Sequence, residues 1–210
     1  MCVCENLHKI LSNFKRHYFP FEENLIPKNG IYFLYEKGEY GHGTDRIVRV
    51  GTHTGHNQLR SRIRQHFCKE NKDRSIFRKN IGRAYLNSRN DSFLEQWEYD
   101  LTSITNRQKY FNLVDKKRLR EIEQIVSQYI QKHFSFVVVD IENKQLRIIY
   151  ESRLISTIFQ CKNCCASLKW FGKHSPKIKI RESGLWLVNE LYKQPFSQKE
   201  FKEFQTFLLK

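Results

Sequence analysis

The stretch that decides the fold runs from Asn29 to Gly51 and reads NGIYFLYEKGEYGHGTDRIVRVG. Ile31–Tyr35 is a compact run of aromatic and aliphatic residues, and Arg46–Val50 is a second run rich in β-branched residues. Both runs are typical of strands. The intervening KGEYGHGTD has three Gly in nine residues, which favours a loop. The stretch therefore predicts a β-hairpin with a long loop.

Helical periodicity surrounds this hairpin. Apolar residues at helical spacing predict helices over residues 5–18, 59–67, 119–130, 147–159 and 201–208. The run FSFVVVDI at 134–141 predicts a third strand. We found no internal repeat and no flexible linker, so we expect one compact α/β (α+β) unit, with a small three-stranded, mainly antiparallel sheet flanked by helices and further helices at the periphery.

The composition points to a polyanionic partner. The 210 residues include 37 Lys and Arg against 22 Asp and Glu, a formal charge of +15. The hydrophobic content of 40% and the aromatic content of 14% exclude a disordered polar chain. Nucleic acid and an anionic membrane surface both fit this charge. No apolar run approaches the roughly 20 residues of a membrane span, and the N-terminus lacks a signal-peptide pattern, so we favour nucleic acid and expect no membrane partner.

The cysteines favour a reducing compartment. All six are clustered or isolated rather than regularly spaced, at Cys2, Cys4, Cys68, Cys161, Cys164 and Cys165. This pattern is unlike a secreted disulfide framework and predicts a cytoplasmic protein. Cys161 and Cys164 have the spacing of zinc ligands, and Cys2 with Cys4 would be a second pair. Only one residue separates that second pair, so ordinary free thiols are favoured over a zinc site.

Two helices carry residues that suggest chemistry. Glu151 lies on the apolar stripe of the 147–159 helix, and a carboxylate there is unfavourable unless it is paired, neutralised or bound to a cation. A salt bridge to an arginine and a functional role remain equally open. In the 59–67 helix, Arg62 and His66 are one turn apart and would present a guanidinium and an imidazole to one phosphate. A solvated basic face is the simpler interpretation of that helix.

These features occur in an order that resembles the GIY-YIG nuclease superfamily. Gly30-Ile31-Tyr32 resembles the first signature, and Arg49-Val50-Gly51 resembles the second. The 59–67 helix is similar to the family's Arg/His helix, and Glu151-Ser-Arg-Leu-Ile155 is similar to its Glu-x-x-Leu-Ile helix. Segments at 74–82 and 170–186 resemble a bacterial, restriction-like subgroup that has Arg-Val-Gly in place of the usual second signature.

The resemblance implies a GIY-YIG fold and a division of the chain. Residues 1–28 would be an N-terminal helical extension, 29–190 the nuclease domain with a helical insertion, and 191–210 a C-terminal helix packed on it. It also implies a metal-dependent DNA endonuclease with a restriction or anti-phage role. Because Arg49 replaces the family's second Tyr, a nucleic-acid-binding protein with impaired cleavage is one alternative. An RNA-directed nuclease is another.

The resemblance also implies roles for the matching residues. Tyr32 would act as the base toward the attacking water, directly or through His66. Arg62 would stabilise the charge of the transition state, and Arg49 would hold the phosphate without acting as a base. Glu151 would hold Mg²⁺ or Mn²⁺.

Three further residues are candidates for this site. Asn163, twelve positions after Glu151, matches an Asn that the family often has there, with a plain loop residue as the alternative. His53, just beyond the second signature, is a candidate to assist or to serve structure. Glu123 competes for the metal role, but its following residues fit Glu-x-x-Leu-Ile less well and it precedes the third strand.

The basic excess includes two acid-free stretches that we expect to contact the DNA backbone. Residues 74–83 contain four Lys and Arg and 162–181 contain six, although a solvated surface is the simpler interpretation. The expected contacts are Arg74, Arg78, Lys79, Lys169, Lys173, Lys177 and Arg181. Duplex DNA is the expected partner. A homodimer, a partner methyltransferase and a defence-system protein remain open, because nothing in the sequence tests them.

Overall fold

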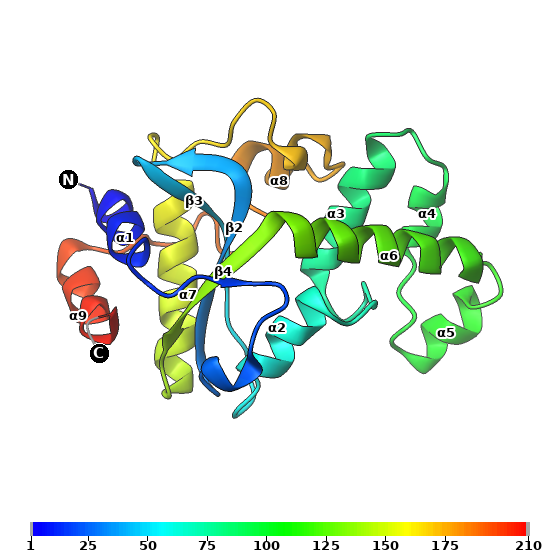
Figure 1. Ribbon diagram of the computed structural model, residues 1–210. Helices are drawn as coiled ribbons and strands as arrows, with labels where there is room; N and C mark the ends of the chain where they lie inside the picture. Colours follow the sequence, from blue (N-terminus) through cyan, green and yellow to red (C-terminus); the bar gives the residue numbers. More distant parts are fainter. Residues whose placement is uncertain (1, 209–210) are drawn as a thin grey trace.

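The computed structural model describes residues 2–208 as an alternation of short helices with one sheet (Figure 1). The elements, in chain order, are α1 (Val3–Leu11), β1 (His17–Tyr18), η1 (Glu23–Leu25), β2 (Gly30–Gly41), β3 (Thr44–Gly51), α2 (Leu59–Phe67), α3 (Ile76–Asn87), α4 (Phe93–Glu98), α5 (Ile104–Tyr110), α6 (Lys116–His133), β4 (Phe134–Asp140), α7 (Lys144–Phe159), η2 (Phe171–His174), α8 (Ile178–Ser183) and α9 (Gln198–Leu208).

The sheet has four strands in the order β1-β4-β2-β3, and every neighbouring pair is antiparallel. The predicted class, a small antiparallel sheet flanked by helices, is confirmed. The prediction of three strands is corrected to four, because the two residues of β1 pair with Phe136 and Ser135 at the edge of β4. A two-residue strand has no periodicity that a sequence can reveal.

The hairpin has longer strands and a tighter turn than the sequence suggested. The strands continue to Gly41 and from Thr44, so only His42 and Gly43 form the turn. Their φ angles of 55° and 76° match a type I′ turn, which joins twisted antiparallel strands in two residues. The predicted long loop is therefore wrong.

Helices cover both faces of the sheet, which explains why Ile31–Tyr35 is apolar throughout. Ile31, Phe33 and Tyr35 face one core, which α1, α7 and α9 complete. Tyr32 and Leu34 face the second core, which α2, α3 and α6 complete together with Trp170 and Trp186. In Figure 1, α1, α7 and α9 lie together on one side of the strands, and α3 to α6 extend away on the other.

The two ends of the chain pack on the first of these cores. The predicted 5–18 helix ends at Leu11, and the chain then turns so that Arg16 stacks 3.4 Å from the centre of the Tyr35 ring. Phe201 and Phe204 of α9 are buried in the same core as Leu7 of α1. The division at residues 28 and 190 stays a prediction. Among the described helices, none combines the length and apolar character of a membrane span.

Candidate active site

Tyr32, His66 and Ser75 form a buried hydrogen-bonded line across three elements. The Tyr32 hydroxyl on β2 lies 2.8 Å from His66 Nε2 on α2. His66 Nδ1 lies 2.7 Å from the hydroxyl of Ser75, the residue that caps the N-terminus of α3. The structure thus joins Tyr32 and His66, as the resemblance implied, and adds Ser75 behind them. Ser75 was missed because the sequence shows it only as a helix cap.

Two glycines allow close packing around Tyr32 and its strand. Tyr32 pairs with Gly51 across the hairpin, and a Cβ at Gly51 would lie 2.2 Å from the Tyr32 hydroxyl. A Cβ at Gly30 would lie 2.2 Å from the carbonyl oxygen of Val139 on the neighbouring strand. Each signature therefore contains a glycine because no side chain fits at that point.

His66 is held in its neutral form. Burial lowers the pKa of its imidazole well below the usual range. The guanidinium groups of Arg62, Arg49 and Arg78 lower that pKa further. A neutral imidazole keeps one nitrogen as an acceptor, so His66 is able to accept the hydrogen bond of the Tyr32 hydroxyl near neutral pH.

Glu151 of α7 faces a cavity of about 300 Å³ next to β3. Its Oε1 accepts a 3.0 Å hydrogen bond from the backbone N–H of Thr52. Burial raises the pKa of the carboxyl; the nearby Arg49 charge opposes that rise, and the Glu190 charge adds to it. Among residues 2–208, Glu151 forms no ion pair within 4.0 Å. The salt-bridge interpretation of this carboxylate is therefore not supported.

Two residues that line the same cavity each have a buried hydrogen-bond donor without a partner among the described residues. Arg49 is buried, and its Nη1 donates to the Trp186 carbonyl oxygen, but its Nε has no acceptor. The amide nitrogen of Asn80 on α3 is buried and likewise unpaired. Both residues line the cavity with Glu151. Unpaired buried donors are unfavourable, and both belong to residues that border the cavity.

Arg62 and His53 line a second cavity of about 320 Å³. Arg62 Nη1 donates to Gln65 Oε1 and to the Arg74 carbonyl oxygen, each at 3.0 Å. His53 Nδ1 lies 2.8 Å from the Gly55 carbonyl oxygen, and its Nε2 is buried without a partner. Thr52 links the cavities, because it lines this one while its N–H bonds Glu151.

Asn163 is not brought to either cavity. It is exposed in the loop that carries Cys161 and Cys164, after the end of α7. Asn189 and Glu190 line the Glu151 cavity instead. The sequence indicates neither residue, because neither belongs to a motif of the resemblance and both approach Glu151 only through the folding of the chain after Trp186.

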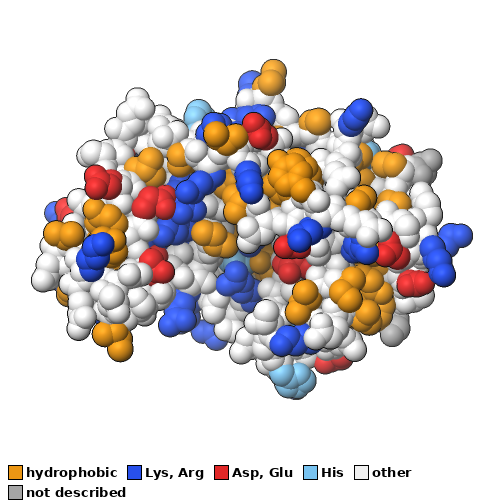
Figure 2. Space-filling view, turned by 180° about the vertical axis from the view of Figure 1, so that it is seen from behind, with side chains coloured by type: hydrophobic (Ala, Val, Ile, Leu, Met, Phe, Trp, Pro, Cys, Tyr) orange, Lys and Arg blue, Asp and Glu red, His pale blue; other side chains and the backbone are white. Residues whose placement is uncertain are grey.

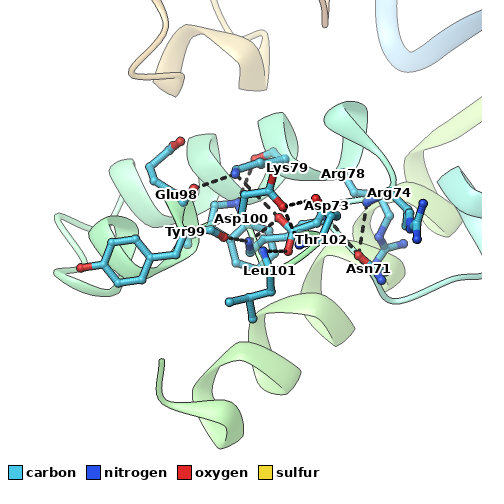
Figure 3. A network of polar contacts seen from close by, with 12 residues as sticks. Asn71, Asp73, Arg74, Arg78, Lys79, Glu98, Tyr99, Asp100, Leu101 and Thr102 are labelled. Carbon is cyan, nitrogen blue, oxygen red and sulfur yellow. Dashed lines mark hydrogen bonds and ion pairs between the residues drawn. The ribbon is translucent and has the colours of Figure 1, made fainter. Parts of the chain in front are cut away.

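The structure also corrects two of the expected DNA contacts. Arg78 is fully buried and donates to Glu123, to Ser127 and to the His66 carbonyl oxygen. Lys79 is buried, and its Nζ donates to the Glu98 carbonyl oxygen at 2.8 Å (Figure 3). Most of α3 is core, so its charges stabilise the fold and do not face a ligand.

The other expected contacts are accessible. Arg181 is half-buried and donates to the Ser175 carbonyl oxygen. Figure 2 shows one face of the molecule, on which Lys and Arg side chains gather near the middle among apolar and a few acidic ones. The exposed members of the expected set are Arg74, Lys169, Lys173 and Lys177.

The residues around Glu151 fit a divalent cation. Its second oxygen accepts no hydrogen bond from residues 2–208, and Glu190 supplies another carboxylate at the cavity. Ser152 donates a 2.6 Å hydrogen bond to Glu190 Oε2 and orients that carboxylate. Carboxylate oxygens are the ligands that Mg²⁺ and Mn²⁺ prefer, with water completing the shell.

The family is established by comparison with known proteins. The model of the GIY-YIG domain matches residues 6–209, which is nearly the whole chain. The chain therefore belongs to the GIY-YIG family, which implies a nuclease with a nucleic-acid substrate and, as is general in the family, a divalent metal. No curated protein and no solved structure gives a significant match to this chain.

Proposed function

We propose that this protein is a metal-dependent endonuclease that hydrolyses phosphodiester bonds in duplex DNA. The observation that carries this proposal is the cavity in which Glu151 lies beside the unpaired donors of Arg49 and Asn80. Such a site offers oxygen ligands for a cation and N–H groups for a phosphate at the same place.

The proton route starts at Tyr32. With Ser75 accepting the Nδ1 proton of His66, the Nε2 lone pair faces the Tyr32 hydroxyl at 2.8 Å. His66 accepts the hydroxyl proton, and the tyrosine oxygen then accepts a proton from the attacking water. Burial and three arginines keep His66 neutral, so its Nε2 lone pair is free near neutral pH. The negative charge of a bound phosphate would offset the arginine charges and raise the pKa of the imidazole, which favours the transfer.

The charged groups bind and stabilise the phosphate. Arg49 donates from the strand beside Tyr32, and Arg62 offers positive charge from the adjoining cavity. Glu151 holds the cation, with Glu190 beside it. When bound, the cation supplies charge neutralisation at the scissile phosphate. His53 assists from the Arg62 cavity, where its Nε2 has no partner among the described residues.

The exposed Arg74, Lys169, Lys173 and Lys177 are our choice for the contacts to the DNA backbone. A restriction or anti-phage role in the cytoplasm is the biological setting we propose, on the resemblance to the restriction-like subgroup. A methyltransferase or another defence-system protein would accompany such a role, and a palindromic target would require a homodimer.

The direct test incubates supercoiled plasmid with the purified protein and Mg²⁺. We expect nicked and linear products, which disappear with a chelator and with Glu151→Gln, while gel-shift binding of the variant persists. Binding without cleavage by the wild type would instead support the impaired-nuclease alternative that Arg49 raises. Cleavage of single-stranded RNA but not of plasmid would support an RNA nuclease. Cleavage that survives Glu151→Gln would contradict the metal assignment.

A further inference from the structure

Four of the six cysteines gather with two histidines at one point of the fold. The groups come from three segments that are far apart in the sequence. Cys2, Cys4 and His8 belong to the start of the chain and α1, and His42 belongs to the turn between β2 and β3. The remaining two are Cys161 and Cys164, in the loop after α7. None of the six lines the Glu151 cavity or the Arg62 cavity.

The donor atoms already have the spacing of a tetrahedral metal site. Sγ of Cys4, Sγ of Cys164 and ring nitrogens of His8 and His42 lie within 4.8 Å of one another. Cys161 Sγ is 3.4 Å from His42 Nε2, and Cys164 Sγ is 3.5 Å from His8 Nε2. Zn–S and Zn–N bonds of about 2.3 and 2.0 Å in a tetrahedron imply sulfur–nitrogen distances of about 3.5 Å.

His8 is oriented by the backbone of α1. Its Nδ1 lies 2.8 Å from the Cys4 carbonyl oxygen, and its Nε2 lies 3.5 Å from Cys164 Sγ and 3.2 Å from the backbone nitrogen of Ile47. A carbonyl oxygen on one ring nitrogen fixes the ring of a metal-binding histidine and leaves the other nitrogen for the ion. The four donors are therefore Cys4, His8, His42 and Cys164, whose ligand atoms lie within 4.8 Å of one another. Cys161 instead lies beside Cys2 and His42.

The backbone at His42 supports a role for its side chain. His42 has φ 55°, in the left-handed region, which glycine or asparagine occupies most readily in such a turn. A histidine here carries its imidazole to the Cys161 thiol. An unusual residue in a sparsely populated conformation is expected where the side chain has a function.

We propose that Cys4, His8, His42 and Cys164 bind a structural zinc ion that ties α1 and the loop after α7 to the β2–β3 turn. The donors are two thiolates and two imidazoles, the ligands that zinc prefers in structural sites, and they leave no open position. Cys4 and Cys164 are buried, which suits a closed site. This site is separate from the carboxylate cavity and does not depend on the proposed nuclease activity.

The test measures the metal content of the full-length protein, purified under reducing conditions without chelator. We expect about one zinc per chain by elemental mass spectrometry. Cys164→Ser should lose that zinc, whereas Cys165→Ser, which removes the neighbouring exposed thiol, should keep it. His42→Asn should also lose zinc while retaining a residue suited to the turn. Cys2→Ser should keep it, because Cys2 is exposed and caps α1.

A second measurement needs no variant. Removing zinc with a chelator and adding Co²⁺ to the wild type should produce the thiolate charge-transfer and visible bands of a tetrahedral site, and chelation should lower the thermal midpoint. Zinc-free wild type that gains no such bands would overturn the proposal. Equal zinc content in Cys164→Ser and Cys165→Ser would also overturn it, as would loss of zinc from Cys2→Ser with retention in Cys4→Ser.

Discussion

Glu123 and Glu151 are both shielded from water by the fold, but they differ in how many hydrogen-bond and ion-pair partners their carboxylates have. Burial raises the pKa of both carboxyls. Glu123 is matched by Arg78, whose Nη2 and Nε donate to it at 2.8 and 3.1 Å, and by the N–H of Lys72. Glu151 has one backbone N–H and faces a cavity. A fully paired buried charge stabilises structure, whereas one left partly unpaired beside a cavity is available to a ligand.

Arg78 and Arg49 differ in the same way, in the number of partners that their guanidinium groups have. Arg78 donates from all three of its nitrogens to partners within the protein. Arg49 donates from Nη1 to Trp186, and its buried Nε has no partner in the described part of the chain. Neither the residue type nor the neighbouring sequence distinguishes these two roles. Only the set of contacts does.

The largest expected effect is on stability. Glu123→Gln would leave the buried Arg78 without its counter-charge and should lower the free energy of unfolding by about 3–5 kcal/mol. Glu151→Gln removes a poorly paired charge and should leave that free energy unchanged or slightly higher. Urea unfolding followed by circular dichroism measures both. Equal losses for the two variants would contradict the comparison.

Removing the Tyr32 hydroxyl should affect cleavage and not folding. Tyr32→Phe breaks the hydrogen bond to His66 and should slow plasmid cleavage by about 10²–10⁴-fold, with gel-shift affinity retained. Tyr35→Phe is the matched control, because Tyr35 lies on the same strand and its hydroxyl has no partner among the described residues. A similar loss of rate in both variants would show that the strand, and not the hydroxyl, is responsible.

The low pKa of His66 predicts a pH-dependent stability. In the unfolded chain this histidine takes up a proton near pH 6.5, but the folded protein resists protonation until a lower pH. Its contribution to stability is therefore present above about pH 6.5 and falls by up to about 1.4 kcal/mol per unit below it. The free energy of unfolding, measured in urea at several pH values, should fall less steeply with decreasing pH in His66→Gln than in the wild type. Equal slopes in the two proteins would contradict the low pKa assigned to His66.

The smallest effects should come from the exposed basic side chains. Replacing Lys169, Lys173 or Lys177 by Gln should reduce the salt dependence of DNA binding by about one unit in the log–log slope. Lys202→Gln is the control, since Lys202 is exposed on α9, which packs on the other core. Affinity measured by gel shift at several salt concentrations distinguishes the three lysine variants from the Lys202→Gln control. Equal slopes for all four variants would place the DNA elsewhere.

Much of the fold around the site is predictable from local sequence patterns. The strands that contain Tyr32 and Gly51 were predicted from their apolar runs. The spacing of Leu59, Ile63 and Phe67 predicted the helix α2, which the structure confirms. The order of these motifs was enough to indicate the family. The lengths of β2 and β3 were not predicted, because the Gly-rich stretch between them is typical of a loop. The strand β1 was not predictable, because His17 pairs with Phe136, which is remote in sequence.

The sequence by itself indicated the hairpin strands, β4, the helices α2, α6 and α7, and the family, because these rest on periodicity and on short motifs, whereas α3, α4 and α5 were not predicted. Tertiary structure alone decided that Arg78 and Lys79 are buried, that Asn189 and not Asn163 lines the Glu151 cavity, and that Cys4 meets Cys164. The physical reason is that charge and spacing are local properties, whereas burial and hydrogen-bond satisfaction depend on which distant segments pack together.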